Sequence, residues 1–504
     1  MSAGVRLMRG VSSSWASIVI IAVTQIYQVR IARRELSEAE FALFGVLSNL
    51  IAAFLIAEVG VRASFSRLLL DARNEGGEAY RRFWASATMV FRVQGLAIGV
   101  LALACTPFLG GWFHVADTQL ATARAVFLLL GGISALGYAF GHHSVSLLAT
   151  QHFVVPNFVN ILVGVAGFGA FVFGIRNGYG LYSYVFSVVP HLIAACVVFP
   201  LITRRLKIAP AATGMRDVSR VEIRRIFVLG FDLFWVALYN LILGHTLLLY
   251  GGFLLSAAQI AILTVNLKFV QFGLQVAQRI PGTAEPVLAQ MVTVQDFARF
   301  RPSWLLAAKG ALGCTILGTG ILYLWAGFAV GHWTSPVDQM SHWPLLMVCL
   351  LPLRYIVHTV CVLACTLFKA ANQLRFALAW ELVLYTALAF PLGRAFGVGG
   401  LLAASIFSLL GGSLIPGLRL VQRMGQFPPG VVPRAIARTL LPGFALLFVV
   451  AGMVPHPESI ALLQRCILTL GWAGAALGLV WFAGLDGAER TCIRGKIALF
   501  RRPA

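Results

Sequence analysis

Five basic side chains lie within apolar stretches that are long enough to span a membrane: Arg92, Lys268, Lys309, Arg354 and Arg465. A cation at the centre of a bilayer costs about 2.5–3.5 kcal/mol on insertion scales. Such a residue persists where it faces the interior of a helix bundle, a water-filled cavity or an anionic ligand. These residue types at this depth therefore favour a path for a negatively charged substrate.

A polar stripe runs along the apolar stretch 255–280. Its members are Thr264, Lys268, Gln271, Gln275 and Gln278, which share one face of a helix. Polar groups are costly against lipid, so this face must line protein or water. The central Lys268 favours a substrate-binding cavity, and hydrogen bonding between helices is the alternative.

A second stripe lies in the stretch 343–367, where Arg354, His358, Cys361 and Cys365 are again one turn apart. Pro352 precedes it and frees a backbone carbonyl. We expect Arg354 to bind an anion, although ordinary packing would also explain it. His358 is a possible proton-sensitive partner or a hydrogen-bonded core histidine, and the two cysteines are packing residues rather than metal ligands.

The remaining polar groups at depth differ in their expected roles. Gln28 belongs to a polar stripe on the first span, and Arg92 lies too deep in the third span to reach the interface, so both are assigned to the cavity. Lys309 and Arg465 lie nearer the predicted span ends, and we expect their side chains to extend to the interface.

Two acidic residues, Asp232 and Glu381, lie about a third of the way into their spans. A carboxylate in a polar cavity can exchange a proton or Na⁺ during transport. A structural salt bridge with one of the cations is an equal alternative. Together with His358, these two residues are the candidates for ion coupling.

The composition is that of an all-α polytopic membrane protein. Hydrophobic residues make up 59% of the chain and charged residues 11%, far below the roughly 25% of a soluble domain. Windows of about 20 apolar residues predict about fourteen transmembrane helices. They lie near 12–33, 39–60, 83–106, 123–147, 153–175, 180–203, 227–250, 255–280, 304–331, 343–367, 375–395, 398–420, 435–454 and 460–484.

The loop charges test this topology. With both termini in the cytoplasm, the cytoplasmic segments carry 28 Lys and Arg residues and the opposite side carries 6. This asymmetry supports the orientation. It also explains most of the net charge of +21, which would otherwise suggest nucleic-acid binding, and it brings cations near anionic lipid headgroups.

The chain divides into two halves of six predicted spans each. We expect an N-terminal lobe at 1–203, a cytoplasmic linker at 204–225, a C-terminal lobe at 226–420, and two last helices with a basic tail at 421–504. Similar residues recur at the heads of both halves, at an offset of about 220 residues. An even number of spans in each half makes the lobes a pseudo-two-fold repeat about an axis along the membrane normal.

Motifs for enzymatic chemistry are not found in the sequence. It contains no GxxxxGK[ST] motif for ATP, no HExxH and no GxSxG. Cysteine and histidine do not occur at zinc-binding spacing. We therefore expect no catalytic residue, no metal and no cofactor.

The junction Arg33-Arg34-Glu35-Leu36-Ser37-Glu38-Ala39-Glu40-Phe41-Ala42-Leu43-Phe44 resembles the R-x-L-x-x-x-E-[FY]-G-x-[FY] junction of bacterial polysaccharide flippases. These flippases belong to the multidrug/oligosaccharidyl-lipid/polysaccharide (MOP) exporter superfamily. The second half has a corresponding stretch from Gly251 to Ala258. Two positions depart from the family pattern: Ala42 replaces a glycine, and His245 stands where members often carry an aspartate.

The resemblance implies two six-helix lobes around a central cavity and transport by alternating access. The substrate would be an undecaprenyl-diphosphate-linked oligosaccharide, carried across the bacterial inner membrane for O-antigen (lipopolysaccharide) or exopolysaccharide biosynthesis. A polysaccharide polymerase and glycosyltransferases would be partners, and lipid II is a further possible substrate. Deep cations suit the diphosphate, and the Gln, Ser and Thr stripes suit sugar hydroxyls.

Two other functions are weighed against this one. A multidrug or cation antiporter of the same superfamily should have an acid-lined cavity, whereas here the deep cations outnumber the acids. A membrane polymerase or ligase should carry catalytic residues in a large outer loop, but the predicted outer loops are short. The flippase is therefore preferred.

Overall fold

The computed structural model describes residues 3–54, 60–150, 152–211, 213–368, 370–454, 457, 460–487 and 489–491. Within these residues the regular secondary structure is helical and contains no strand. The predicted all-α class is therefore confirmed. It follows from hydrophobic runs that satisfy their own backbone hydrogen bonds, as a segment in hydrocarbon must.

The chain forms two compact units, residues 1–261 and 262–504. The structure thus groups the long helix after the predicted linker with the first unit, where it packs on four earlier helices. The division into repeated six-helix lobes with a linker at 204–225 stays a prediction.

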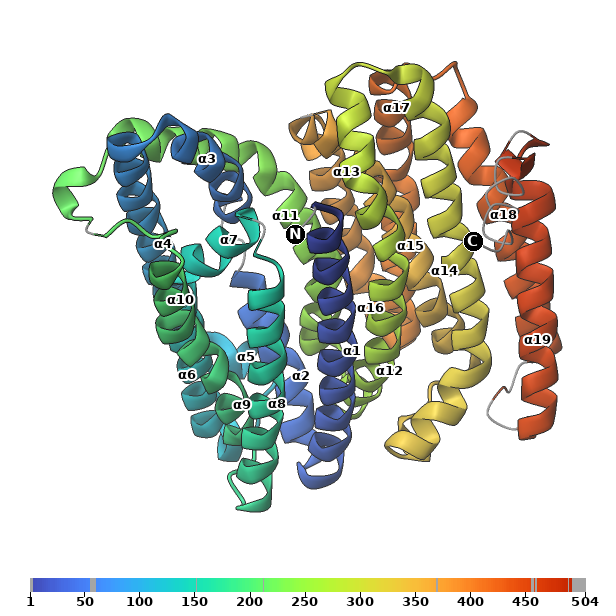
Figure 1. Ribbon diagram of the computed structural model, residues 1–504. Helices are drawn as coiled ribbons and strands as arrows, with labels where there is room; N and C mark the ends of the chain where they lie inside the picture. Colours follow the sequence, from blue (N-terminus) through green and yellow to red (C-terminus); the bar gives the residue numbers. More distant parts are fainter. Residues whose placement is uncertain are drawn as a thin grey trace. The chain divides into compact units, whose positions relative to one another are not determined.

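Figure 1 shows the helices of the first unit in blue to green. They are α1 (Ala3–Glu35), α2 (Glu38–Ala53), α3 (Val61–Glu75), α4 (Gly77–Cys105), α5 (Leu109–Phe113), α6 (Asp117–Ala139), α7 (Gly141–Ala149), α8 (Val154–Arg176), α9 (Tyr182–Ile193), α10 (Phe199–Arg205) and α11 (Arg220–Leu254).

Small residues bring the helices of the first unit close together. Helix α4 packs along α6, and α8 packs along both α1 and α9. A Cβ at Gly95 would lie 2.4 Å from the Ala135 carbonyl oxygen, and one at Gly167 would lie 2.4 Å from that of Ser187. Such contacts are the usual basis of helix association in membranes, where lipid gives little hydrophobic drive.

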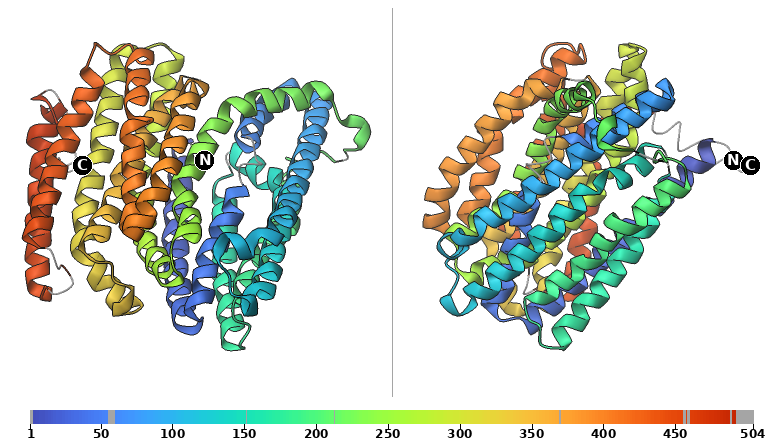
Figure 2. Two further views of the ribbon diagram at one scale, coloured as in Figure 1. Left: turned by 180° about the vertical axis from the view of Figure 1, so that it is seen from behind. Right: turned by 90° about the vertical axis from the view of Figure 1, so that its left-hand side faces the viewer.

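The second unit contains the remaining helices, which the left-hand view of Figure 2 shows as yellow to red ribbons. They are α13 (Arg279–Thr293), α14 (Phe297–Trp333), α15 (His342–Leu367), α16 (Arg375–Gly411), α17 (Leu414–Met424), α18 (Val431–Met453) and α19 (Leu462–Leu479). Helix α12 (Ala257–Ala277) begins in the first unit and lies mainly in the second.

Helix α14 is the centre of the second unit, because it packs on α13, α15, α18 and α19. Its buried Trp304 and Leu312 join Ile356 of α15 and Phe427 in one core cluster. Further along, Trp472 of α19 packs on Gly320 and donates its indole N–H to the Leu317 carbonyl over 2.9 Å. The two predicted C-terminal helices are therefore part of this unit.

Nine helical segments of the described chain are long and apolar enough to cross a membrane, and they correspond to ten predicted spans. The segment 375–424 contains two of these spans. The predicted spans 12–33, 39–60, 227–250 and 255–280 overlap the helices α1, α2, α11 and α12, which are not among the nine.

Helix α16 is two antiparallel arms that meet at Gly397, where φ is 58° and ψ is −133°. Only glycine adopts this conformation readily. The arms run back along each other, because a Cβ at Gly412 would lie 2.7 Å from the Cβ of Glu381. The predicted division between 375–395 and 398–420 is thus confirmed, whereas the single span predicted at 123–147 is interrupted at Phe140, between α6 and α7.

The packing of α14 on α19 gives a first test. A Cβ at Gly320 would lie 1.9 Å from the Trp472 ring, so Gly320→Ala should destabilise the protein by about 1–3 kcal/mol through overpacking. Thermal unfolding of the purified protein in detergent measures the change. The matched control is Gly318→Ala, because no atom lies within 4 Å of a Cβ at that site. An equal effect of both substitutions would contradict this packing.

Candidate functional site

A buried ion pair joins α15 to the first arm of α16. One guanidinium nitrogen of Arg354 lies 2.6 Å from Glu381 Oε1, and the two side chains are 3% and 2% exposed. A charge in so apolar a setting is tolerated only when it is paired and hydrogen-bonded. Arg354 and Glu381 therefore neutralise each other inside the second unit.

Ser413 and His358 extend this pair into a four-residue network. The Ser413 hydroxyl donates to Glu381 Oε2, and the Ser413 oxygen lies 3.3 Å from His358 Nδ1. A hydroxyl has one proton to donate, so Nδ1 of His358 must be the donor towards Ser413. All four side chains are buried, and they tie α15, both arms of α16 and the junction with α17 together.

The local sequence explains how this network forms. Arg354 and His358 are one turn apart on α15, as the spacing predicted. Gly412 lets the chain approach Glu381 too closely for any side chain at that position, which places Ser413 against the carboxylate. Sequence reasoning missed Ser413, and the Gly411-Gly412 pair before it was the available signal of a close approach.

This arrangement bears on the expected roles of Arg354 and Glu381. Their pairing is the structural salt bridge that is the alternative to ion coupling by Glu381. An anion could bind Arg354 at this position only by competing with Glu381. Ion coupling by Glu381 and His358 stays a prediction, since a paired carboxylate can still exchange a proton.

The expectation that Lys309 and Arg465 extend to the interface is wrong. Lys309 of α14 is 6% exposed and binds both carboxylate oxygens of Glu489, over 2.7 and 2.9 Å. Arg465 of α19 is fully buried, donates to the carbonyls of Pro457 and Ile460, and faces the ring of Phe328. Both cations have partners inside the protein. Sequence reasoning did not identify Glu489 as the partner of Lys309, because the two residues are 180 positions apart.

Lys268 and Gln271 lie on α12 and are half-buried, whereas Thr264 of the same stripe is buried. The side chain of Gln275 lies outside the described residues. Among the described residues, no carboxylate lies within ion-pair distance of Lys268. The predicted polar face of α12 is therefore only partly buried, and no described carboxylate neutralises the charge of Lys268.

The predicted site residues of the first unit lie apart from any described ion pair. Arg92 of α4 is exposed, and Gln28 of α1 is half-buried. The side chain of Asp232 on α11 lies outside the described residues. His245, at a position where the resembled family often carries an aspartate, bonds to Asn49 Oδ1 over 2.8 Å and so links α11 to α2.

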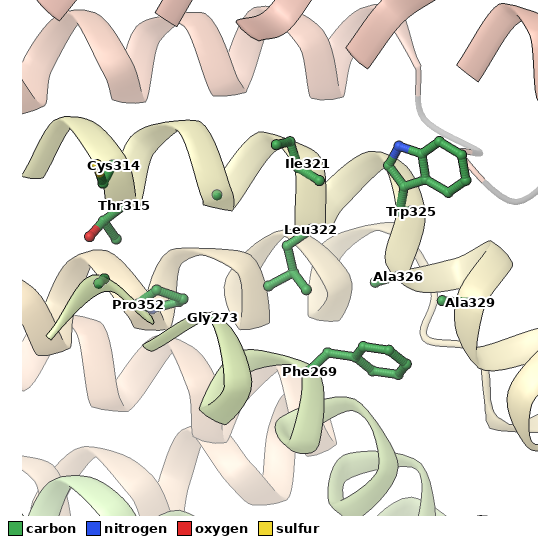
Figure 3. Close-up of a pocket in the computed structure, with 12 residues that line it drawn as sticks. Phe269, Gly273, Cys314, Thr315, Ile321, Leu322, Trp325, Ala326, Ala329 and Pro352 are labelled. Atoms are coloured by element: carbon green, nitrogen blue, oxygen red, sulfur yellow. The ribbon is translucent and has the colours of Figure 1, made fainter. Parts of the chain in front are cut away.

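A cavity of about 350 Å³ lies within the second unit, among α12, α14 and α15. Figure 3 shows Phe269 and Gly273 on one side of it, and Ile321, Leu322 and Trp325 of α14 on the other. Pro352 completes the wall, and Thr315 contributes its hydroxyl, which already donates to the Ala311 carbonyl. The lining suits a hydrocarbon rather than a sugar.

A second cavity of about 390 Å³ lies among α15, α16 and α18 of the same unit. Its walls are leucines and phenylalanines, among them Phe407, Phe444 and Phe448. Arg354 also borders it, so this residue stands between Glu381 and an apolar space. Among the lining residues that the structure describes, neither cavity has an unpaired acidic side chain.

No protein-family profile and no curated protein sequence matches the chain. Several solved structures do. The lipid II flippase MurJ in an inward closed conformation matches with a TM-score of 0.66 at 14% identity, covering 97% of this chain and 99% of the flippase. The chain has the fold of the MOP-superfamily transporters.

Other members of this fold match over a smaller share of the chain. A MOP-superfamily transporter from Pyrococcus furiosus, described as having a binding pocket of reverse polarity, gives a TM-score of 0.62 at 12% identity over 84% of this chain and 99% of its own. An inward-facing multidrug resistance MATE family transporter gives 0.59 at 14% identity, with the same coverages. At these identities the likeness concerns the fold.

The buried network provides a second test. Glu381→Gln leaves the Arg354 cation buried without a counter-charge, so it should lower stability by about 3–5 kcal/mol. The double variant Arg354→Met/Glu381→Gln should lose less than the sum of its two single variants, and Ser413→Ala should cost only about 1 kcal/mol. Melting temperatures in detergent measure all four. A wild-type melting temperature for Glu381→Gln would show that the pair does not form.

Proposed function

We propose that this protein is a transporter that flips an undecaprenyl-diphosphate-linked oligosaccharide across the bacterial inner membrane, for the synthesis of a surface polysaccharide. The substrate has three chemically different parts, namely a hydrocarbon chain, a diphosphate and a sugar chain. Transport requires that the protein shelter the charged and polar parts from lipid during the crossing. No bond is made or broken, so the function is not enzymatic.

The observation that carries the proposal is the extent of the fold match. The match with the lipid II flippase covers 97% of the chain, whereas the multidrug transporter match covers 84%. The remaining 16% is close to the share of segment 421–504, which is 84 of 504 residues and contains α18 and α19. A fold match that extends over a further segment of this size favours a lipid-linked substrate over a drug.

The charge balance at depth supports an anionic substrate. Glu381 and Glu489 are each occupied by a basic side chain, Arg354 and Lys309. Arg92 and Lys268 have no carboxylate at ion-pair distance among the described residues. A diphosphate would accept charge-assisted hydrogen bonds from such groups, whereas a cationic drug would be repelled.

The second unit has apolar cavities that suit the hydrocarbon part of the substrate. The two cavities of the second unit are apolar and have volumes of about 350 and 390 Å³, within the usual range for ligand pockets. A part of the isoprenoid chain could occupy either cavity, because the linings are almost wholly apolar. Gln28 and Gln271, both half-buried, are assigned to sugar hydroxyls.

The wider setting belongs to the same proposal. Both termini would lie in the cytoplasm, as the loop charges predict. Glycosyltransferases would supply the substrate on that side, and a polysaccharide polymerase would use it on the other. Asp232, Glu381 and His358 remain the proposed coupling groups.

Reconstitution into proteoliposomes tests the function directly. A fluorescent undecaprenyl-diphosphate oligosaccharide is quenched by a membrane-impermeant reagent when it reaches the outer leaflet. Arg92→Ala and Lys268→Ala should each slow flipping about tenfold or more, because a hydrogen bond to a charged group contributes about 1.5–3 kcal/mol. Arg176→Ala, which removes an exposed arginine at the end of α8, is the matched control.

Two results would contradict the proposal. Wild-type flipping by both Arg92→Ala and Lys268→Ala would remove the proposed anionic site. Absence of flipping in the wild-type protein, together with extrusion of an organic cation driven by a proton or Na⁺ gradient, would favour the multidrug antiporter instead.

A further inference from the structure

The described residues between α10 and α11, 206–211 and 213–219, form a strap that is fixed along the start of α4. The Tyr80 hydroxyl donates to the Ile208 carbonyl over 2.6 Å, and the Ser219 amide donates to Ser86 Oγ over 2.9 Å. Between these points, Arg81 forms an ion pair of 2.8 Å with Asp217. Figure 1 shows the strap in green, running from α10 past α4 to α11.

These contacts place the strap at one end of the membrane-crossing helices of the first unit. The candidate span Tyr182–Arg205 ends just before the strap, and the candidate span Gly77–Phe113 begins beside it. The predicted span 227–250 starts shortly after it, within α11. The strap therefore lies where three chain segments leave the hydrocarbon, at the level of the lipid headgroups.

Six basic side chains in and beside the strap are exposed: Arg204, Arg205, Lys207, Arg216, Arg220 and Arg224. None of them forms an ion pair with a described residue. The local acids are occupied elsewhere. Asp217 binds Arg81, and Glu222 lies 3.9 Å from Arg225. The Gly214 amide, and after it the Arg81 guanidinium, lower the pKa of Asp217, so this carboxylate stays ionised in its pair.

Exposed apolar side chains accompany these cations. Met215 and Val221 are 75% and 73% exposed. On α11, Arg220 and Arg224 are followed at helical spacing by Val228 and Phe231, which are also exposed. One helix face thus changes from cationic to apolar within about two turns, as a surface does at the boundary between headgroups and hydrocarbon.

We propose that the strap and the start of α11 form a binding surface for anionic phospholipid headgroups. The phosphates would bind the six exposed cations, and Met215, Val221 and Val228 would insert among the acyl chains. Arginine suits this role because its planar donors match phosphate oxygens. A nucleic acid or an acidic protein would satisfy the charges but would leave the apolar side chains in water. This surface does not depend on which substrate the transporter carries.

Lipid titration tests the proposal on the full-length protein. Phosphatidylglycerol or phosphatidylcholine is added to protein in a neutral detergent, and bound lipids are counted by native mass spectrometry. The wild type should retain phosphatidylglycerol in preference, and ~1 M salt should weaken this preference. The variant Lys207→Gln/Arg216→Gln/Arg220→Gln should bind phosphatidylglycerol about a hundredfold more weakly at low salt, because each basic residue near the surface contributes about 1 kcal/mol.

The matched control is Arg34→Gln/Arg176→Gln/Arg394→Gln, which removes three exposed arginines from the predicted opposite side. It should retain wild-type phosphatidylglycerol binding. Melting temperatures establish that both variants are folded. Equal loss in the two variants, or equal binding of the two lipids by the wild type, would overturn the proposal. The flipping assay is independent of this outcome, so either idea can fail alone.

Discussion

The need to pair or hydrogen-bond the charges that lie in an apolar interior shapes the second unit. Arg354 with Glu381 and Lys309 with Glu489 are cross-links whose partners are 27 and 180 residues apart. Removing either partner from such a pair costs far more than the pair itself contributes, because the remaining charge is left in a medium that cannot solvate it. The pairs therefore fix which helices adjoin within the unit: α15 must meet α16, and the chain after α19 must return to α14.

Close packing makes these pairs possible. Lipid is as apolar as leucine, so helices associate through small residues, shape and interhelical hydrogen bonds. Gly412 allows the second arm of α16 to reach Glu381, and Gly320 allows Trp472 to lie against α14. Gly397 reverses the chain so that the two arms of α16 can pack together. Glycine thus sets the distances at which charged side chains can meet.

The sequence predicted the helices well, because hydrophobic length and one-turn spacing are local properties. It also placed Arg354 and His358 on one face and separated the arms of α16. It offered a salt bridge between Glu381 and one of the cations as an alternative, but it did not identify Arg354 as that cation. It also did not predict that Ser413 would join the pair or that Glu489 would bind Lys309. These are tertiary contacts between distant segments, and depth along a helix does not reveal the partner. For the same reason, the prediction that the side chains of Lys309 and Arg465 extend to the interface was wrong. It rested only on the distance of each residue from the ends of its span.

A side chain that is committed to an internal pair is less available to a substrate. Arg354, Lys309 and Arg465 each have strong partners inside the second unit, so an anion would have to displace a carboxylate or several backbone carbonyls. Arg92 is exposed and Lys268 is half-buried, and neither has a carboxylate partner among the described residues. The predicted depth set only Lys309 and Arg465 apart from the other cations, whereas the internal partners show that Arg354 too is held within the second unit.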